Sequence, residues 1–540
     1  MRKYSPLLVI VVLTIFFRFF WLADVPPSPS LDEVSIGWNA YSILETGGDE
    51  YGNKFPILLR AYDDWRPALY VYLVIPFIKL FGLNATSVRL PSVILSALTV
   101  LATYFLCLEL FGKEKMGRRI AFWTSLTLAI SPWHVYLSRL GHEVNPQVAL
   151  TVFGLLFFLR FVRRKKPQYL FVSALWFALS FYTYQSQKIF GPLLLVSLGI
   201  IYVKELRFKW KTVLLAGIFG LILIVPMIRA SLSPQALLRF EGTSLFNQNE
   251  ELLKESALKL IDDKKNDNYL GLVLHNRRVV ILSQAIKAYS SHFNPIWLFS
   301  NRGAESHKVP NLGLFYLWEL PLMFLGLIFL FKKKSLKKMR WVILSLIFLS
   351  PVSASITTDF PHAMRMFNAI PGPQMLTALG VVYLASFELW RRLKWGIGGI
   401  IVFSCLALFR CYFVNFPVEQ SDSFQYPLKQ AISYVIENEG DYERIVFSNK
   451  DNTFQSYMFF LFYSKFDPVE YQQLGGTISG GFAESHQIGK FEFVSSEKLK
   501  KPEELEENVL LVGNYNRLGD KGGQIFNSLS GEPRIIVVEK

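Results

Sequence analysis

The sequence predicts a polytopic all-α membrane domain followed by a small C-terminal α/β domain. Of the 540 residues, 51% are hydrophobic and only 18% are charged, against roughly 25% charged in soluble proteins. Many apolar stretches reach the roughly 17 to 25 residues that a helix needs to cross a bilayer. From about residue 415 onward the charges are spread evenly and short alternating apolar patterns appear, which are typical of strands.

The first apolar stretch, Pro6 to Ala23, follows the basic residues Arg2 and Lys3 and so resembles a signal peptide. It has no small-residue cleavage site and continues into Asp24-Val25-Pro26-Pro27. We therefore predict a retained first span.

The formal charge of +15 is concentrated in short segments between apolar stretches. These segments are Arg2 and Lys3, 113–119, 163–166, 204–211, 332–340 and 391–394. Basic residues beside membrane spans mark the cytoplasmic face, so the charge predicts a membrane orientation and no nucleic-acid partner. The cysteines, Cys107, Cys405 and Cys411, all lie in apolar stretches and predict neither a disulfide framework nor a zinc site.

The stretch Leu69 to Phe81 is too short to span a bilayer and contains Pro76 and Lys79. If it crossed, the basic segment 113–119 would lie outside, against the positive-inside rule. We predict that it lies flat in the outer interface. The other spans then alternate without conflict, about eleven in all: 6–23, 88–111, 120–138, 146–162, 168–184, 188–203, 212–229, 314–331, 341–356, 371–387 and 395–414.

This topology divides the chain into a transmembrane domain, 1–414, with external loops at 24–87 and 230–313, and an extracytoplasmic domain, 415–540. The protein is predicted to be a multi-pass protein of the cell (inner or plasma) membrane with a cytoplasmic N-terminus. In the C-terminal domain we expect strands at Arg444 to Ser448, Phe491 to Val494, Val509 to Val512 and Ile535 to Val538, and helices at Leu428 to Asn438 and Thr453 to Tyr463.

The first external loop contains Ser30-Leu31-Asp32-Glu33 ahead of an apolar periodic stretch. This pattern predicts a capping box, with Ser30 as the N-cap and Glu33 returning a hydrogen bond. Capping alone is favoured about two to one over a catalytic role when these residues are taken by themselves. It leaves Asp32 unexplained except for its interaction with the helix dipole.

Further polar residues fall at the same predicted outer face: Arg66, Arg139, His142, Glu143, His362 and Arg365. Taken singly, each arginine is expected to snorkel to the headgroups and each histidine to be structural. Together with Asp32 and Glu33 they suit a reaction between a lipid phosphate and an extracytoplasmic acceptor. No HExxH, CxxC, Walker, GxSxG or dinucleotide-binding motif is present in a suitable context.

The arrangement of motifs resembles the GT-C membrane glycosyltransferases. More narrowly, it resembles the protein O-mannosyltransferases and the lipid A aminoarabinose transferase. The resemblance covers most of residues 1–390 and rests on the order and placement of its motifs. These are Asp32-Glu33, Arg66-Pro67, Leu80-Phe81-Gly82, Arg89-Leu90-Pro91, Ser131-Pro132-Trp133-His134, Ser138-Arg139, Tyr182-Thr183-Tyr184, His307, Gly313 to Pro321 and Pro361-His362-Ala363-Met364-Arg365.

The resemblance implies an inverting transferase that moves a hexosyl or pentosyl group from a polyprenyl-phosphate-sugar donor to a protein, lipid or glycan acceptor outside the cytoplasm. By position, Asp32 matches the family's essential acid, the general base, and Glu33 matches its partner. Many relatives have a second proline where this chain has Ala68. Glu143 stands where relatives often have Asp.

The implied chemistry suits these residue types, because charge builds on the departing lipid phosphate as the sugar bond breaks. Guanidinium groups of Arg66, Arg139 or Arg365 would stabilise that charge. His142, Glu143 and His362 are candidates for substrate or metal contacts. Some members of the superfamily use a divalent metal ion, and the sequence leaves the metal, the sugar and the acceptor open.

Two other classes of function compete with this interpretation. A lipid or glycan transporter or flippase would predict broken helices and polar residues near mid-membrane, often in repeated halves. The sequence has few such residues and no repeat. A sensor acting only through its external C-terminal domain would leave the acidic pair and the arginines without a role.

Overall fold

A computed structural model describes residues 5–62, 64–234, 250–300, 307–388, 390–449, 453–478, 485–495, 508–520 and 522–539. Arg2, Lys3 and parts of the predicted loop 230–313 lie outside these residues. The chain forms two compact units, which are described separately. The helical unit comprises Met1–Thr14, Ala97–Val135 and Val144–Ser404, and the mixed unit comprises Ile15–Ser96, Tyr136–Glu143 and Cys405–Lys540.

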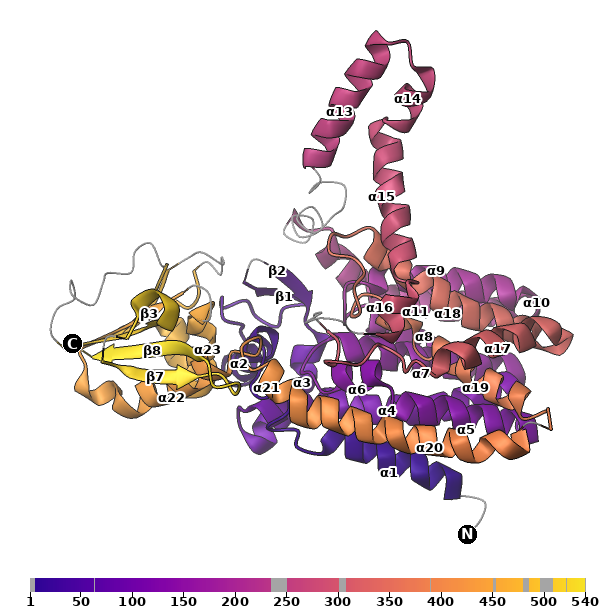
Figure 1. The fold of residues 1–540 in the computed structure, drawn as a ribbon, viewed down its shortest axis with the longest axis horizontal. Coiled ribbons are helices and arrows are strands. Elements are labelled where there is room, and N and C mark those ends of the chain that lie inside the picture. The colour runs from indigo at the N-terminus through magenta and orange to yellow at the C-terminus, as the bar shows by residue number, and fades with distance from the viewer. Residues whose placement is uncertain are drawn as a thin grey trace. The chain divides into compact units, whose positions relative to one another are not determined.

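The helical unit consists of helices joined mostly by short turns (Figure 1). Those within it are α5 (Lys115–Ala129), α7 (Val144–Arg164), α8 (Pro167–Ser180), α9 (Gln187–Ile201), α10 (Val203–Phe208), α11 (Trp210–Ser231), α13 (Glu250–Lys265), α14 (Tyr269–Leu274), α15 (Arg277–Ser291), α16 (Pro295–Phe299), α17 (Glu319–Lys332), α18 (Lys337–Ser355) and α19 (Gly372–Leu384). Boundaries between the two units fall within four further helices: α1 (Ser5–Phe19), α4 (Ala85–Phe111), α6 (Pro132–Ser138) and α20 (Trp390–Leu408).

Small residues allow the closest helix packing in this unit. A Cβ atom on Gly326 of α17 would lie 2.0 Å from the carbonyl oxygen of Leu376, and one on Gly380 of α19 would lie 1.9 Å from that of Leu322. The two helices therefore touch backbone to backbone, as small residues permit in membrane helix pairs.

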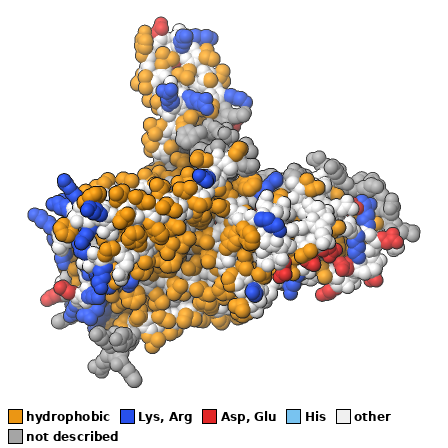
Figure 2. Space-filling model, turned by 180° about the vertical axis from the view of Figure 1, so that it is seen from behind, with side chains coloured by type: hydrophobic (Ala, Val, Ile, Leu, Met, Phe, Trp, Pro, Cys, Tyr) orange, Lys and Arg blue, Asp and Glu red, His pale blue; other side chains and the backbone are white. Residues whose placement is uncertain are grey.

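Each predicted span overlaps a helix of the structure. Among the described residues, four helices are long and apolar enough to cross a membrane: Ala85–Phe111, Val144–Arg164, Trp210–Ser231 and Arg392–Glu419. Figure 2 shows a broad hydrophobic surface on the helices and basic side chains gathered at one end of them. The count of about eleven spans and the interfacial position of α3 (Leu69–Phe81) remain predictions.

The mixed unit contains a six-stranded sheet in the order β4-β5-β3-β6-β8-β7. Strand β3 pairs in parallel with β5 and β6, whereas the outer pairs are antiparallel. The strands are β3 (Arg444–Ser448), β4 (His486–Ile488), β5 (Phe491–Val494), β6 (Val509–Asn514), β7 (Gln524–Asn527) and β8 (Pro533–Glu539). The four predicted strands and the two predicted helices, here α22 (Tyr426–Asn438) and α23 (Ser456–Ser464), are confirmed. Strands β4 and β7 were not predicted.

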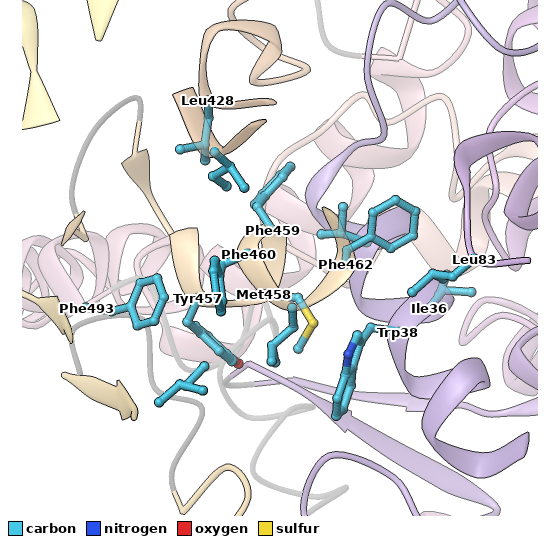
Figure 3. Close-up of a cluster of buried hydrophobic side chains, with 14 of the residues drawn as sticks. Ile36, Trp38, Leu83, Leu428, Tyr457, Met458, Phe459, Phe460, Phe462 and Phe493 are labelled. Atoms are coloured by element: carbon cyan, nitrogen blue, oxygen red, sulfur yellow. The ribbon is translucent and has the colours of Figure 1, made fainter. Parts of the chain in front are cut away.

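The core of the mixed unit joins this C-terminal region to helix α2 (Leu31–Thr46) and to α3. Trp38 of α2 and Met458 of α23 are fully buried in it, and Figure 3 shows them together with Phe462. A Cβ atom on Gly37 would lie 2.5 Å from the ring of Phe462, so glycine permits this close approach. The start of α2, which carries the acidic pair, is thereby held by residues more than 400 positions away.

Candidate active site

The acidic pair begins helix α2 through the predicted capping box. The backbone nitrogen of Glu33 donates to Ser30 Oγ at 3.3 Å, and the backbone nitrogen of Ser30 donates to Glu33 Oε2 at 2.8 Å. Both halves of the box are present, which confirms the local prediction. Asp32 and Glu33 are neighbours in the first turn, yet their side chains have different surroundings.

Glu33 is buried and fully engaged. Its carboxylate accepts from Nε of Arg89 at 2.7 Å, from Nη2 of Arg89 at 3.3 Å, and from the backbone nitrogen of Gly141 at 2.9 Å. The side chain of Glu33 is 1% exposed and that of Arg89 is 0% exposed. This two-pronged pair between α2 and α4 holds Glu33 in place and leaves it no access to a substrate.

Arg89 also connects this pair to the segment that precedes α2. Its guanidinium donates to the carbonyl oxygens of Leu22, Pro26 and Ser28 at 2.9, 3.1 and 2.9 Å. A buried arginine has five N–H donors that need acceptors, and backbone carbonyls accept from N–H groups that do not bond to Glu33. The sequence had offered Arg89 only as part of a family motif, and the structure shows it as the anchor of the site.

Asp32, by contrast, has a side chain that is 48% exposed. Its Oδ1 accepts a hydrogen bond from Nη2 of Arg66 at 3.1 Å. Arg66 lies on β2 (Asp64–Pro67), which forms an antiparallel hairpin with β1 (Leu58–Ala61), and it pairs there with Leu59. Two of the predicted site residues are therefore brought together in space.

Arg66 is the buried partner of this ion pair, since its side chain is only 6% exposed. Burial by itself lowers the pKa of Arg66, but the charges of Asp32 and Glu143 more than offset this, and its pKa is raised. Its Nη1 is buried and has no hydrogen-bond partner among the described residues. The guanidinium thus keeps its charge, and the two N–H groups of Nη1 are buried and unpaired among the described residues.

His142 and Glu143 complete the cluster around Arg66. His142 Nε2 lies 3.7 Å from Oδ2 of Asp32, and its Nδ1 lies 3.5 Å from Oε2 of Glu143. The side chains of His142 and Glu143 are 11% and 6% exposed. The imidazole stands between two carboxylates, so the structure brings both of these candidates to Asp32.

Arg139 is engaged elsewhere in the same unit. It is fully buried and donates to the carbonyl oxygens of Arg18 at 2.7 Å and Val25 at 2.8 Å. Its guanidinium also lies 4.8 Å from the ring centroid of Phe413. These contacts satisfy carbonyls at and beyond the C-terminal end of α1, where helices leave acceptors unpaired, and they suit a structural anchor better than a phosphate ligand.

Glu50 is a buried acid that the sequence analysis did not single out. Its carboxylate accepts from Asn39 at 3.0 Å, from Thr477 at 2.9 Å and from Tyr457 at 3.2 Å. Burial raises the pKa of Glu50 to about 7, and the neighbouring Asp49 adds to the shift. It links helix α2 and the segment that follows it to the C-terminal region, which is why neither sequence segment alone pointed to it.

His362 and Arg365 belong to the helical unit, whereas Asp32 and Arg66 belong to the mixed unit. The backbone nitrogen of His362 donates to Nε2 of His292 at 3.2 Å, and the ring of His362 stacks on that of His307 at 5.0 Å. Arg365 Nη1 donates to Thr357 Oγ1 at 2.8 Å and to the carbonyl oxygen of Thr358 at 2.7 Å.

The residues at Asp32 do not suit a divalent metal ion. Arg66 already supplies the positive charge beside Asp32 and raises the cost of adding a dication there. In the part of the chain that the structure describes, no three His, Cys, Asp or Glu side chains form a group that could hold a metal ion. We therefore derive no step through a metal.

Comparison with known proteins bears on the family resemblance and on the fold. Residues 66–229 match the family described as dolichyl-phosphate-mannose-protein mannosyltransferase. The crystal structure of ArnT from Cupriavidus metallidurans bound to undecaprenyl phosphate aligns over 99% of this chain and 98% of its own, with a TM-score of 0.56 and 11% identity. The chain has the GT-C fold.

The apo crystal structure of the same ArnT gives the same values. The archaeal oligosaccharyltransferase AglB from Archaeoglobus fulgidus, in complex with an inhibitory peptide and a dolichol-phosphate, aligns over 86% of this chain and 64% of its own, with 13% identity and a TM-score of 0.47. No curated protein sequence matches the chain. The predicted resemblance to GT-C membrane glycosyltransferases is confirmed.

Proposed function

We propose that this GT-C protein is an inverting glycosyltransferase that takes a sugar from a polyprenyl-phosphate-linked donor and transfers it to an acceptor outside the cytoplasm. The observation that carries the proposal is the half-exposed carboxylate of Asp32 beside the buried guanidinium of Arg66. The fold agrees with it, because the ArnT structure of the same fold holds undecaprenyl phosphate.

In this proposal Arg66 binds the donor phosphate. Its Nη1 has no protein partner among the described residues, and its Nη2 is shared with Asp32. A phosphate that reaches this guanidinium gains charge-assisted hydrogen bonds and weakens the hold on Asp32. As the sugar bond breaks, the same guanidinium stabilises the growing negative charge, a contribution of roughly 3 to 4 kcal/mol for one well-placed donor in other enzymes.

Asp32 acts as the general base. Its exposure leaves room for an acceptor hydroxyl, and phosphate binding at Arg66 turns an ion-paired carboxylate into a more basic one. His142 lies on the second oxygen of Asp32 and keeps the carboxylate oriented. The acceptor hydroxyl gives its proton to Asp32, and its oxygen then attacks the anomeric carbon of the sugar from the side opposite the departing phosphate. The attack inverts the configuration at that carbon.

The other candidates take supporting roles in the proposal. Glu33 and Arg89 hold the start of α2, and Glu143 keeps Arg66 charged. Arg139 is assigned to anchoring α1 and no longer to the phosphate. In the helical unit, Arg365 remains proposed for the donor phosphate and His362 for a substrate contact. The protein is proposed to lie in the cell membrane with its N-terminus in the cytoplasm.

The test replaces Asp32 with asparagine, which keeps its shape and removes its basicity. Membranes carrying Asp32→Asn are supplied with a radiolabelled polyprenyl-phosphate sugar, and label transferred to endogenous acceptors is counted. We expect the rate to fall about 100- to 10,000-fold, the usual contribution of a general base. Thermal unfolding of the variant should be nearly unchanged, because the carboxylate is half exposed.

Asp24→Asn is the matched control, since Asp24 is an exposed carboxylate of the same loop. It should leave transfer unchanged. If Asp32→Asn bound the donor and transferred label at the wild-type rate, Asp32 would not be the general base. If the wild type transferred label from none of the polyprenyl-phosphate sugars, the proposed activity itself would be overturned.

A further inference from the structure

An apolar groove of about 1060 Å³ lies between α9 and α18 of the helical unit. Its lining residues are more than 150 positions from the acidic pair in the sequence. Its walls include Val196 and Ile200 of α9 and Phe348 and Leu349 of α18. Val196 and Ile200 are 62% and 71% exposed. The volume is at the upper end of ligand pockets, which hold roughly 300 to 1,000 Å³.

One end of the groove is basic. Lys204, Lys337 and Lys338 line it there. Lys338 forms an ion pair with Glu205, which neutralises it. Lys204 and Lys337 are exposed and have no ion-pair partner among the residues that the structure describes. Two uncompensated cations therefore stand where the apolar walls end.

The length of the groove matches one leaflet of a bilayer. From Lys337 to Leu349 the helix α18 rises about 18 Å at 1.5 Å per residue, and half of a hydrocarbon core is about 15 Å. Trp341 lies one turn from the lysines and is 49% exposed, in the position that tryptophan favours at a membrane interface.

We propose that this groove binds an anionic phospholipid of the leaflet on the basic side of the protein. Its acyl chains lie along Val196, Ile200 and Phe348, and its headgroup phosphate contacts Lys204 and Lys337. A zwitterionic lipid would satisfy the walls equally, but the cationic group beside its phosphate offsets the phosphate charge, so the net charge of the two lysines would remain uncompensated. The groove belongs to the predicted cytoplasmic half of α9 and α18, so this site is independent of the proposed transfer reaction.

The binding preference is measured by native mass spectrometry of the protein taken from nanodiscs of phosphatidylcholine mixed with phosphatidylglycerol. We expect the wild type to retain phosphatidylglycerol in preference to phosphatidylcholine. Each lysine near an anionic lipid favours binding about 5-fold, so Lys204→Gln with Lys337→Gln should reduce the preference roughly 30-fold. The pair Lys113→Gln with Lys115→Gln, exposed and basic but outside the groove, should leave it unchanged.

A second readout locates the lipid. Brominated phosphatidylglycerol should quench the fluorescence component that Trp341→Phe removes, and brominated phosphatidylcholine should quench it less. Equal retention of both lipids by the wild type would mean that only bulk lipid fills the groove and would overturn the proposal. Displacement of phosphatidylglycerol by polyprenyl phosphate at equal concentration would overturn it as well, in favour of a second site for that lipid.

Discussion

Asp32 Oδ1 accepts a hydrogen bond from Nη2 of Arg66 at 3.1 Å, across 34 positions of the chain. One partner is half exposed and the other is 6% exposed. An ion pair open to water on one side adds little to stability, about 0 to 1 kcal/mol. The pair therefore explains little of the fold's stability, and the buried, unpaired Nη1 of Arg66 is consistent with the proposed phosphate-binding role.

Replacing Arg66 tests this interpretation through the donor lipid. Arg66→Met should raise the KM for a polyprenyl-phosphate sugar roughly 10- to 100-fold, the range expected for losing a charge-assisted hydrogen bond. Arg66→Lys should recover part of the loss, because it restores the charge without the planar fork. Arg60→Met, on the same hairpin, is the control. A changed acceptor KM with an unchanged donor KM would contradict the assignment.

Arg89 is expected to matter for folding and not for chemistry. Arg89→Met leaves the carboxylate of Glu33 buried without its partner, a change that costs about 3 to 5 kcal/mol in buried pairs. Thermal unfolding in detergent should show a clear loss of stability, whereas Arg410→Met, which removes an exposed arginine, should show little. Equal stabilities of the two variants would show that the pair does not hold the start of α2.

Glu50 should make stability depend on pH. Its pKa is raised to about 7 in the folded protein, from 4.5 for an exposed carboxyl, so the folded state holds the proton more tightly between these values. The contribution of Glu50 to the free energy of unfolding should therefore be greatest below about pH 4.5. It should fall by about 3 kcal/mol between pH 4.5 and pH 7 and then level off.

Glu50→Gln should flatten this dependence, since the amide is neutral at every pH. Unfolding temperatures of wild type and variant, measured from pH 5 to pH 8, check the slope. Glu45→Gln, an exposed acid of α2, should keep the slope of the wild type. Parallel curves for Glu50→Gln and the wild type would contradict a protonated Glu50 in the core.

Chelation of divalent metal ions should leave transfer unchanged. The guanidinium of Arg66 stands beside Asp32 and already provides the positive charge that a metal would supply. The assay compares initial rates of label transfer before and after dialysis against EDTA. Activity that disappears on dialysis and returns with added Mg²⁺ or Mn²⁺ would show that a divalent metal ion takes part in transfer.

Several features followed from sequence because they depend on neighbouring residues. The capping box of Ser30 and Glu33 is set by spacing within one helical turn, and the strands β3 and β6 are set by runs of β-branched and apolar residues. The apolar stretches likewise predicted the helices, since lipid demands long apolar segments whatever the tertiary arrangement.

Contacts between distant segments were decided only by the tertiary structure. Nothing local to Arg139 distinguishes an arginine that binds carbonyls near the end of α1 from one that binds phosphate. Glu50 becomes a buried acid only because Tyr457 and Thr477 close over it. The sequence by itself determined which residues could take part in the site, and the packing decided which of them are anchored and which remain available, because burial and partners are properties of the folded chain.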